Sequence, residues 1–256
     1  MSKPSYSRLG VISPMANEEK TINSFIIEVL KSLRPVDYLF IIVDNKSQDQ
    51  TRDIVSAFSK KDQRVRLVWA PENRCIVDAY FRGYREALNE GCDWILEMDG
   101  GFSHNPNEIP FFLEQIGLGV DFLAGSRFSS GGAHTGSLKR YFISRIGSIL
   151  SNLLLGSKMN DMTSGFQCFS RAALEHVMEQ NVMSQAHFFQ TEIRFMLKDW
   201  RWREIPITYT NPNKNMAVGN IKEALYLLLL LFASRRLKIS GVENWIKQKR
   251  TALLQR

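Results

Sequence analysis

The 256-residue chain is 44% hydrophobic with mixed charges, which is ordinary for a globular protein with one substantial core, and we expect one domain with a tail. Its net charge of +7 and isoelectric point near 9.4 indicate an acidic partner: nucleic acid, a nucleotide phosphate or an anionic membrane surface. Its three cysteines, Cys75, Cys92 and Cys168, are widely separated and odd in number, which excludes a disulfide framework and a zinc knuckle and favours a reducing compartment.

Strands and helices are predicted to alternate through the first hundred residues. The opening segment MSKPSYSRLG is polar and lacks the apolar core of a signal peptide, so nothing suggests secretion. Short runs rich in Val and Ile at 10–14, 39–44 and 65–70, and the run CDWILEMD at 92–99, predict four strands. This order predicts an α/β fold whose mostly parallel sheet is covered by helices on both faces.

The helices between these strands carry their own signals. After Asn17, apolar residues repeat at helical spacing from Ile22 to Leu33, with Glu18 and Glu19 near the positive helix start. The pattern from Ser47 to Gln50 reads as a capping box for the second helix, and the third helix ends at Gly91.

Ligands of parallel sheets gather at the carboxyl ends of the strands. Pro14, Asp44 and Asp99 all stand at such ends, so the sequence places a ligand site there. The four histidines, in contrast, are not in metal-ligand spacing with one another.

The second half of the chain is less regular. A Gly- and Ser-rich stretch at 126–137 predicts a mobile loop, followed by a helix over 138–155 and a late strand in WREIPITYT. The apolar run 224–232 precedes Arg and Lys residues. As a helix it spans ~14 Å, about half of a bilayer core, so it cannot cross a membrane unaided. It either lies in a membrane interface with its cations on the headgroups or packs as a buried helix on the sheet.

Five blocks in order, VISPMANEEKTI, IIVDNKSQDQT, ILEMDGGFSH, AGSRF and DMTSGFQCFSR, resemble family 2 glycosyltransferases of the GT-A fold. Within the family, the chain is most similar to the polyprenyl-phosphate hexose synthases, the group of dolichol-phosphate mannose synthase. The likeness covers residues 8 to 210. It implies a Rossmann-like catalytic domain over 1–220 and an apolar, basic helical tail over 221–256 that contacts a membrane interface.

The resemblance implies an inverting hexosyltransferase that uses a nucleotide-diphosphate sugar, linked to GDP or UDP, and a polyprenyl phosphate at the cytoplasmic membrane face. A nucleic-acid role rests on charge alone and is set aside. The matching donor-site residues are Pro14, Ala16, Asn17, Glu18, Asp44, Arg74 and Asp99. From the residues alone, Asn17 and Glu18 could instead cap a helix, and Ser47 and Asp49 fit capping of the second helix better than ligand binding.

Arg127, Arg140 and Ser144 resemble the family's acceptor-phosphate cluster. Residues 140 and 144 share one face of a helix, and the guanidinium fork suits phosphate oxygens. An ionised phosphate needs positioning and charge neutralisation more than a general base. Asp161 lies in the matched D-x-T-S-G-F segment, and with Asp99 and Arg127 it completes the catalytic set that the resemblance implies.

The chain departs from the family where D-x-D is usual, because Gly101 replaces the second acid that would help to bind Mg²⁺ or Mn²⁺. Three alternatives remain open. A cation is held by Asp99, diphosphate oxygens and water; Glu97 joins Asp99 as a displaced pair on one side of a strand; or Lys and Arg do the electrostatic work without metal. We expect weak metal dependence.

Two other functions fit less well. A soluble or saccharide acceptor would need a general base, and the sequence offers only Asp161 or Glu192. The missing acid also allows a catalytically weakened nucleotide-sugar-binding protein. A dinucleotide dehydrogenase is disfavoured, since no G-x-G-x-x-G follows the first strand. The chain also departs from the family pattern at Cys75–Val77 and at Lys46, and only Lys214 remains of a late basic motif. These differences leave the base of the donor nucleotide open.

Overall fold

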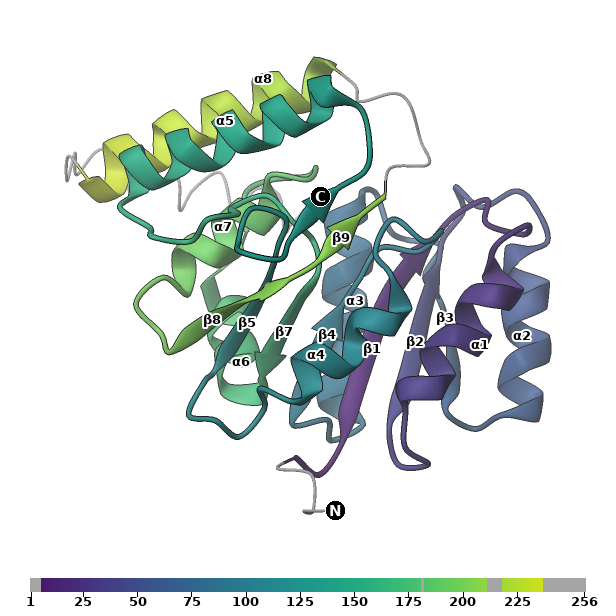
Figure 1. Cartoon of the computed structure of the whole chain (residues 1–256). Helices are drawn as coiled ribbons and strands as arrows, with labels where there is room; N and C mark the ends of the chain where they lie inside the picture. Colours follow the sequence, from purple (N-terminus) through teal and green to yellow (C-terminus); the bar gives the residue numbers. More distant parts are fainter. Residues whose placement is uncertain (1–5, 181, 211–217, 237–256) are drawn as a thin grey trace.

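The computed structural model describes residues 6–180, 182–210 and 218–236 and contains an α/β sandwich (Figure 1). The first half consists of β1 (Leu9–Met15), α1 (Ile22–Ser32), β2 (Tyr38–Val43), α2 (Thr51–Lys61), β3 (Val65–Trp69), α3 (Ile76–Asn89) and β4 (Trp94–Glu97). The second half consists of the 3-10 turn η1 (Pro106–Glu108), α4 (Ile109–Leu113), β5 (Phe122–Ser126), β6 (Ala133–His134), α5 (Leu138–Leu155), β7 (Gln167–Ser170), α6 (Arg171–Gln180), α7 (Phe189–Met196), β8 (Trp202–Pro206), β9 (Thr208–Tyr209), α8 (Val218–Leu231) and the π-helical turn η2 (Phe232–Arg236).

The main sheet has seven strands in the order β3-β2-β1-β4-β7-β5-β8. β7 runs antiparallel to both of its neighbours, and the other pairs are parallel. The order reverses direction beside β1, where β2 lies on one side and β4 on the other, which is where ligands of open α/β sheets bind. The predicted mostly parallel sheet is confirmed.

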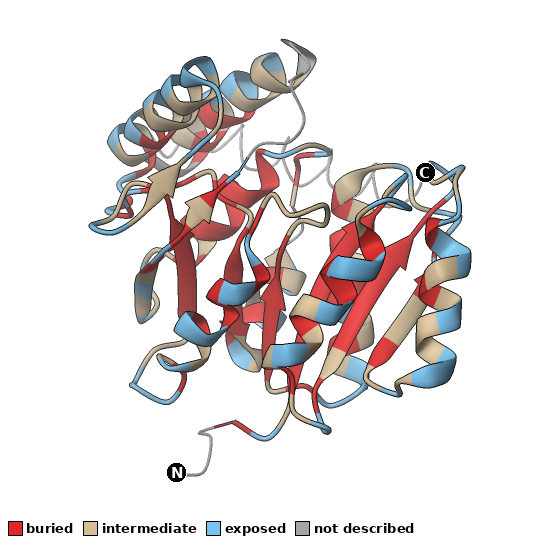
Figure 2. Ribbon diagram, turned by 45° about the vertical axis from the view of Figure 1, so that its right-hand side comes forward, coloured by how far each residue is buried: buried red, intermediate tan, exposed pale blue. Residues whose placement is uncertain are grey.

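Both faces of the sheet are covered, and each has its own apolar core. One core joins the strands to Phe25 and Val29 of α1, Val55 of α2 and Phe112 of α4. The other core joins them to α3, α6 and α7, with Tyr80, Tyr84, Leu174, Phe189 and Ile193 among its members. Figure 2 shows the strands buried between these layers. The helices on both faces are therefore confirmed.

The helix starts differ in one respect from the sequence prediction. α2 begins at Thr51, and Ser47 does not cap it, because the Ser47 hydroxyl accepts the backbone N–H of Asn17 at 3.1 Å. The N-cap is Gln50, which makes no side-chain cap hydrogen bond, and the Asp49 carboxylate before it accepts the Thr51 N–H at 3.0 Å. The end of α3 is as predicted, with Gly91 at φ 75°.

The Gly- and Ser-rich stretch is not a plain loop. It contains β6, which pairs in parallel with β9 to form a second, two-stranded sheet. α5 then spans the predicted residues, with the Ser137 side chain accepting the Arg140 N–H at its start and Gly156 in the left-handed conformation at its end.

The predicted apolar run lies in α8, which packs against α5 rather than on the sheet. Leu227, Leu228 and Leu231 form a small core with Leu155 of α5 and Phe188. Figure 1 shows α5 and α8 side by side beyond the edge of the sheet. The alternative of a helix packed on the sheet is therefore wrong. No helix in the described ranges is long and apolar enough to span a bilayer.

The division of the chain at residue 220 stays a prediction. α8 begins at Val218 and continues through that position. Lys214 and the residues after 236 lie outside the described part of the chain.

Candidate functional site

The loops after β1 and β2 are fastened to each other by Asn17. Its backbone is left-handed, with φ 59°, which is uncommon for a residue other than glycine. Its side chain donates to the Lys46 carbonyl at 3.1 Å and accepts the Gln48 N–H at 2.9 Å. α1 begins after Thr21, so Asn17 is not its cap. This uncommon backbone conformation of Asn17 is retained where the two loops meet at the carboxyl edge of the sheet. We call the surface formed by these two loops the shelf. Ala16 is exposed there, and Pro14 is buried.

Asp44 and Arg74 lie at the neighbouring strand ends. Asp44 is 8% exposed, and its carboxylate accepts the Lys46 N–H at 2.9 Å. The Lys46 ammonium donates to the Arg74 carbonyl at 3.1 Å, which links the β2 and β3 loops. The Arg74 guanidinium forms an ion pair with Asp78 at 3.0 Å. Direct contact of either residue with a nucleotide stays a prediction.

Asp99 lies just after β4 and is held by two side chains that sequence reasoning missed. The Tyr80 hydroxyl of α3 donates to its carboxylate at 2.7 Å, and the Asp99 N–H donates to His104 Nδ1 at 3.0 Å. Burial raises the pKa of Asp99, but electrostatic interactions with the neighbouring His104, His187 and Arg140 side chains and the Tyr80 hydrogen bond outweigh it, so the pKa lies below its ordinary value. Asp99 is therefore an anion with a fixed orientation.

Glu97 has a different environment, although it is only two residues away. It is completely buried, and its carboxyl accepts the Gln167 side-chain amide at 2.7 Å. Burial raises its pKa to about 8, despite the hydrogen bonds from Gln167 and Gln190 that lower it. β4 ends at Glu97, so strand alternation no longer places Asp99 on the same side. A neutral, enclosed carboxyl is a poor metal ligand at neutral pH.

The two glycines after Asp99 are closely packed against side chains of β1 and of the loop after it. A Cβ on Gly100 would lie 2.9 Å from Met15 Cγ, and a Cβ on Gly101 would lie 2.7 Å from Oε1 of Glu18. Within the described ranges, no three His, Cys, Asp or Glu side chains group closely enough to hold a metal ion. Glu18 lies against Gly101, two residues after Asp99. These two carboxylates are the kind of oxygen ligand that Mg²⁺ and Mn²⁺ prefer, so the residues present fit a cation that would also take ligands from a bound diphosphate.

Arg127 and Asp161 form a buried ion pair beside the end of β5, in the second half of the sheet. Two guanidinium nitrogens of Arg127 donate to the Asp161 carboxylate at 2.7 and 2.9 Å, and both side chains are almost completely enclosed. Burial opposes the charge of Asp161, but Arg127 outweighs it and holds the pKa of the carboxyl far below its ordinary value. The remaining Arg127 nitrogen donates to the Ser144 hydroxyl at 3.3 Å. Arg127 thus connects this pair to α5.

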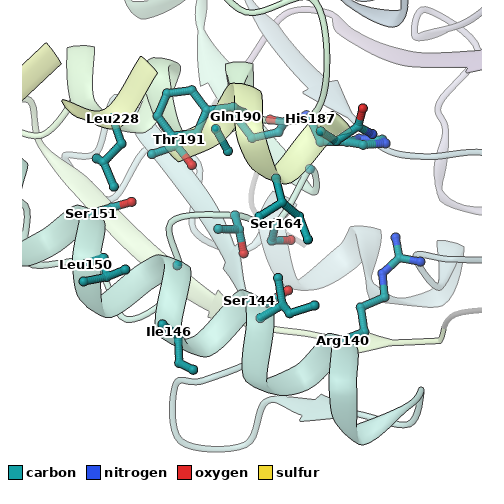
Figure 3. Close-up of a pocket in the computed structure, with 18 of the residues that line it drawn as sticks. Arg140, Ser144, Ile146, Leu150, Ser151, Ser164, His187, Gln190, Thr191 and Leu228 are labelled. Atoms are coloured by element: carbon teal, nitrogen blue, oxygen red, sulfur yellow. The ribbon is translucent and has the colours of Figure 1, made fainter. Parts of the chain in front are cut away.

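Arg140 and Ser144, one helical turn apart on α5, line a cavity of about 380 Å³. Arg140 donates to the Tyr209 hydroxyl at 3.2 Å. In Figure 3, Arg140 and His187 lie at one end of this cavity, while Leu150 and Leu228 lie at the other, between α5 and α8. Asp99 and Arg127 also belong to its lining. The cavity therefore extends from Asp99, after β4, to the predicted acceptor cluster. One end of it is polar and the other is apolar.

A second buried arginine holds one side of the cavity in place. Arg194 of α7 is fully enclosed and donates to the carbonyl oxygens of Gly125, Asp161 and Ser164. It fixes the segment containing Gly165, where a Cβ would lie 2.9 Å from Gln190 Nε2, so that a side chain there would displace the Gln190 amide. No sequence motif distinguishes Arg194 from a surface arginine.

The two acids that the sequence offers as general bases are both held by protein groups, and a catalytic role for Asp161 stays a prediction. Glu192 is fully buried and accepts the backbone N–H groups of Met183 and Ser184, at 3.2 and 2.8 Å. Asp161 is neutralised by Arg127. Both carboxylates are thus held in place by neighbouring protein groups. His187, which has no metal-ligand spacing in the sequence, is exposed and lines the cavity.

Comparison with known proteins adds the following. The family model "Glycosyl transferase family 2" matches residues 10–178. The chain is 28% identical to polyprenol monophosphomannose synthase of Mycolicibacterium smegmatis over 226 residues, covering 86% of this chain and 84% of that protein. It is 27% identical to undecaprenyl-phosphate mannosyltransferase of Micrococcus luteus over 224 residues, covering 85% and 91%.

Solved structures also resemble it. Glucosyl-3-phosphoglycerate synthase from Mycobacterium tuberculosis, in complex with Mn²⁺, uridine diphosphate and phosphoglyceric acid, superposes with a TM-score of 0.64 at 17% identity, over 89% of this chain and 78% of that one. The same enzyme with Mg²⁺ and uridine diphosphate gives a TM-score of 0.63 at 18% identity, over 89% and 79%. At such identities the likeness shows the fold.

Proposed function

Because the chain belongs to glycosyl transferase family 2 and has the GT-A fold, we propose that it transfers a hexose from a nucleotide-diphosphate sugar to a polyprenyl phosphate, with inversion at the sugar carbon. One observation carries the proposal. A single cavity is lined by Asp99, by the Arg140 and Ser144 pair, and by apolar side chains between α5 and α8. It therefore offers a place for a sugar, for a phosphate and for a hydrocarbon chain.

The donor end lies over the first half of the sheet. The shelf made by Asn17 and the β2 loop suits a nucleoside, and Asp44 suits hydroxyl or ring N–H groups, because an ionised carboxylate accepts strong hydrogen bonds. The diphosphate then extends toward Asp99. A divalent cation bound there would neutralise the leaving diphosphate. In this arrangement the sugar carbon faces the cavity.

The acceptor end explains why no general base is needed. A phosphate monoester is ionised at neutral pH, so its oxygen attacks without losing a proton. That oxygen forms the new bond to the sugar carbon on the side opposite the diphosphate, whose bond to the carbon breaks as the nucleoside diphosphate leaves. Arg140 offsets the repulsion between the two anions, and the Arg127–Asp161 pair keeps Ser144 in place beside it.

A lipid acceptor is supported by apolar surface around the cavity. α5 exposes a stripe at helical spacing, made of Leu138, Phe142, Ile146, Ile149 and Leu153. α8 adds Leu225, Tyr226 and Leu229, each about half exposed. We call these eight residues the apolar platform. Apolar patches of this kind mark membrane or partner surfaces. The relatives named after polyprenol and undecaprenyl phosphate favour a membrane, and we propose peripheral attachment at the cytoplasmic membrane face.

The test is transfer from a panel of labelled GDP- and UDP-sugars to polyprenyl phosphate in lipid vesicles, with extraction of the lipid product. We expect labelled lipid from one donor, with the glycosidic configuration opposite to that of the donor. Labelled lipid from no donor would defeat the proposal. Label recovered only on a soluble phosphate or saccharide would assign a different acceptor, and nucleotide binding without any transfer would indicate a weakened homologue.

A further inference from the structure

The position left without an acid in the D-G-G segment is filled from another loop. A Cβ on Gly101 would lie 2.7 and 2.9 Å from the two carboxylate oxygens of Glu18. The Glu18 carboxylate therefore lies where the side chain of an acid at position 101 would begin. Glu18 comes from the loop after β1, whereas Asp99 follows β4, the strand paired with β1.

The loop carrying Gly101 is held against the start of α1. Gly101 and Phe102 are both left-handed, with φ 66° and 62°, which is costly for a bulky aromatic residue. The Phe102 ring packs edge-on against Phe25 of α1, with ring centroids 5.8 Å apart. This contact retains the strained turn and keeps the glycine in contact with Glu18.

Glu18 is also held from its own side. Its backbone N–H donates to the Thr51 hydroxyl at 2.8 Å, and its carbonyl accepts the N–H groups of Thr21 and Ile22. Its carboxylate accepts the Thr21 hydroxyl. Among the described residues, no lysine or arginine forms an ion pair with it. The Glu18 carboxylate is thus oriented by neutral groups, and no ion pair in the described part of the chain offsets its charge.

Two oriented carboxylates from separate strand ends provide oxygen ligands for a divalent cation, and a diphosphate and water complete the shell. We propose that Glu18 supplies the second carboxylate of a cation site at Asp99, in place of the acid absent at position 101. The inference rests on the proposed donor, a nucleoside diphosphate, and is independent of the acceptor. Gly101 is then a requirement of the site, because any side chain there displaces Glu18.

The test is calorimetric titration of UDP and GDP, with Mn²⁺ or with EDTA, into the full chain. For the wild type, we expect Mn²⁺ to increase the affinity for one nucleotide by about 10-fold or more. Glu18→Gln retains an oxygen for Thr21 but loses the charge, so it should abolish most of this increase, measured for each variant as the ratio of its affinity with Mn²⁺ to its own affinity in EDTA. Glu19→Gln, at the neighbouring exposed acid, is the matched control and should behave as the wild type.

A second variant exchanges the position of the charge. Glu18→Ala combined with Gly101→Asp moves the carboxylate to position 101, where aspartate tolerates the left-handed backbone better than most residues. It should recover the Mn²⁺ effect that Glu18→Ala alone loses. Retention of the full Mn²⁺ effect in Glu18→Gln, no recovery on exchange, or no Mn²⁺ effect in the wild type would each overturn the inference. Failure of the wild type to bind either nucleotide would instead overturn the proposed function.

Discussion

The two halves of the sheet hold their carboxylates in opposite ways. At the ends of β1, β2 and β4, Glu18, Asp44 and Asp99 are hydrogen-bonded by neutral groups: a threonine hydroxyl, a backbone N–H and a tyrosine hydroxyl. Beside β5, Asp161 is paired with Arg127. The first arrangement keeps negative charge available for a ligand, whereas the second cancels charge and stiffens the wall of the cavity. Hydrogen bonds from neutral groups without an ion pair therefore distinguish the acids that we propose bind the donor from Asp161, whose charge is paired.

The largest effect is expected when one partner of the buried Arg127–Asp161 pair is replaced. Arg127→Met leaves the Asp161 carboxylate buried and unpaired, which should cost ~3–5 kcal/mol of unfolding free energy. Arg127→Met with Asp161→Leu should recover much of the loss, because an apolar pair leaves no buried charge. Urea unfolding measures both. The control is Arg201→Met at the exposed Arg201–Asp121 pair, which should change little. An equally small loss for Arg127→Met would contradict a structural role.

The same pair contributes to the stability of the fold in acid. The folded-state pKa of Asp161 lies below that of the unfolded chain, so its contribution is complete above about pH 4 and is lost as the pH falls toward the folded value. Below that point the wild type should lose up to ~1.4 kcal/mol per pH unit through this group. The double variant, which lacks the group, should show a flatter profile in acid.

Next in size is the effect of neutralising Asp99. Asp99→Asn retains an oxygen that accepts the Tyr80 hydroxyl, so the fold should persist. Turnover should fall by ~10²-fold or more, because the charge facing the donor diphosphate is lost. Asp53→Asn, at an exposed acid of α2, serves as the control in the same transfer assay. Activity close to that of the wild type in Asp99→Asn would remove this residue from the site.

Arg140 should show a smaller effect that is confined to the acceptor. Arg140→Gln should raise the KM for a short-chain isoprenyl phosphate by ~10-fold and leave nucleotide affinity unchanged, since one charge-assisted contact is lost. Steady-state kinetics with a soluble acceptor keep the membrane out of the measurement. Lys139→Gln, at the adjacent exposed cation of α5, should match the wild type. A rise in KM for the donor alone would place Arg140 at the other end of the cavity.

The smallest effect concerns the apolar platform. Phe142→Glu and Leu153→Glu each place a charge on an exposed apolar position of α5 and should lower vesicle partitioning by ~10-fold. Sedimentation with anionic vesicles measures this, and activity on the soluble acceptor should persist. Leu118→Glu, at an exposed leucine outside α5 and α8, is the matched control. Equal losses at all three positions would indicate that the platform is not the contact surface.

Much of the site could be predicted because local patterns determine it. Pro14 lies near the end of β1, Asp44 and Asp99 follow β2 and β4, and parallel strands bring such ends together. The predicted pairing of Arg140 and Ser144 on one helical face holds, since α5 spans the predicted residues. The predicted capping role of Ser47 was wrong, because the competing N–H of Asn17 comes from another loop, which a local pattern does not reveal.

The sequence by itself determined the order of strands and helices and the carboxyl-edge location of the acids, because hydrophobic period and chain direction are local properties. Tertiary structure alone decided that Arg127 neutralises Asp161, that Glu18 lies against Gly101 and that α8 packs on α5. Each of these contacts joins residues far apart in the chain. Their partners are selected by packing and by the need to satisfy buried charge, which become defined only when the whole sheet has formed.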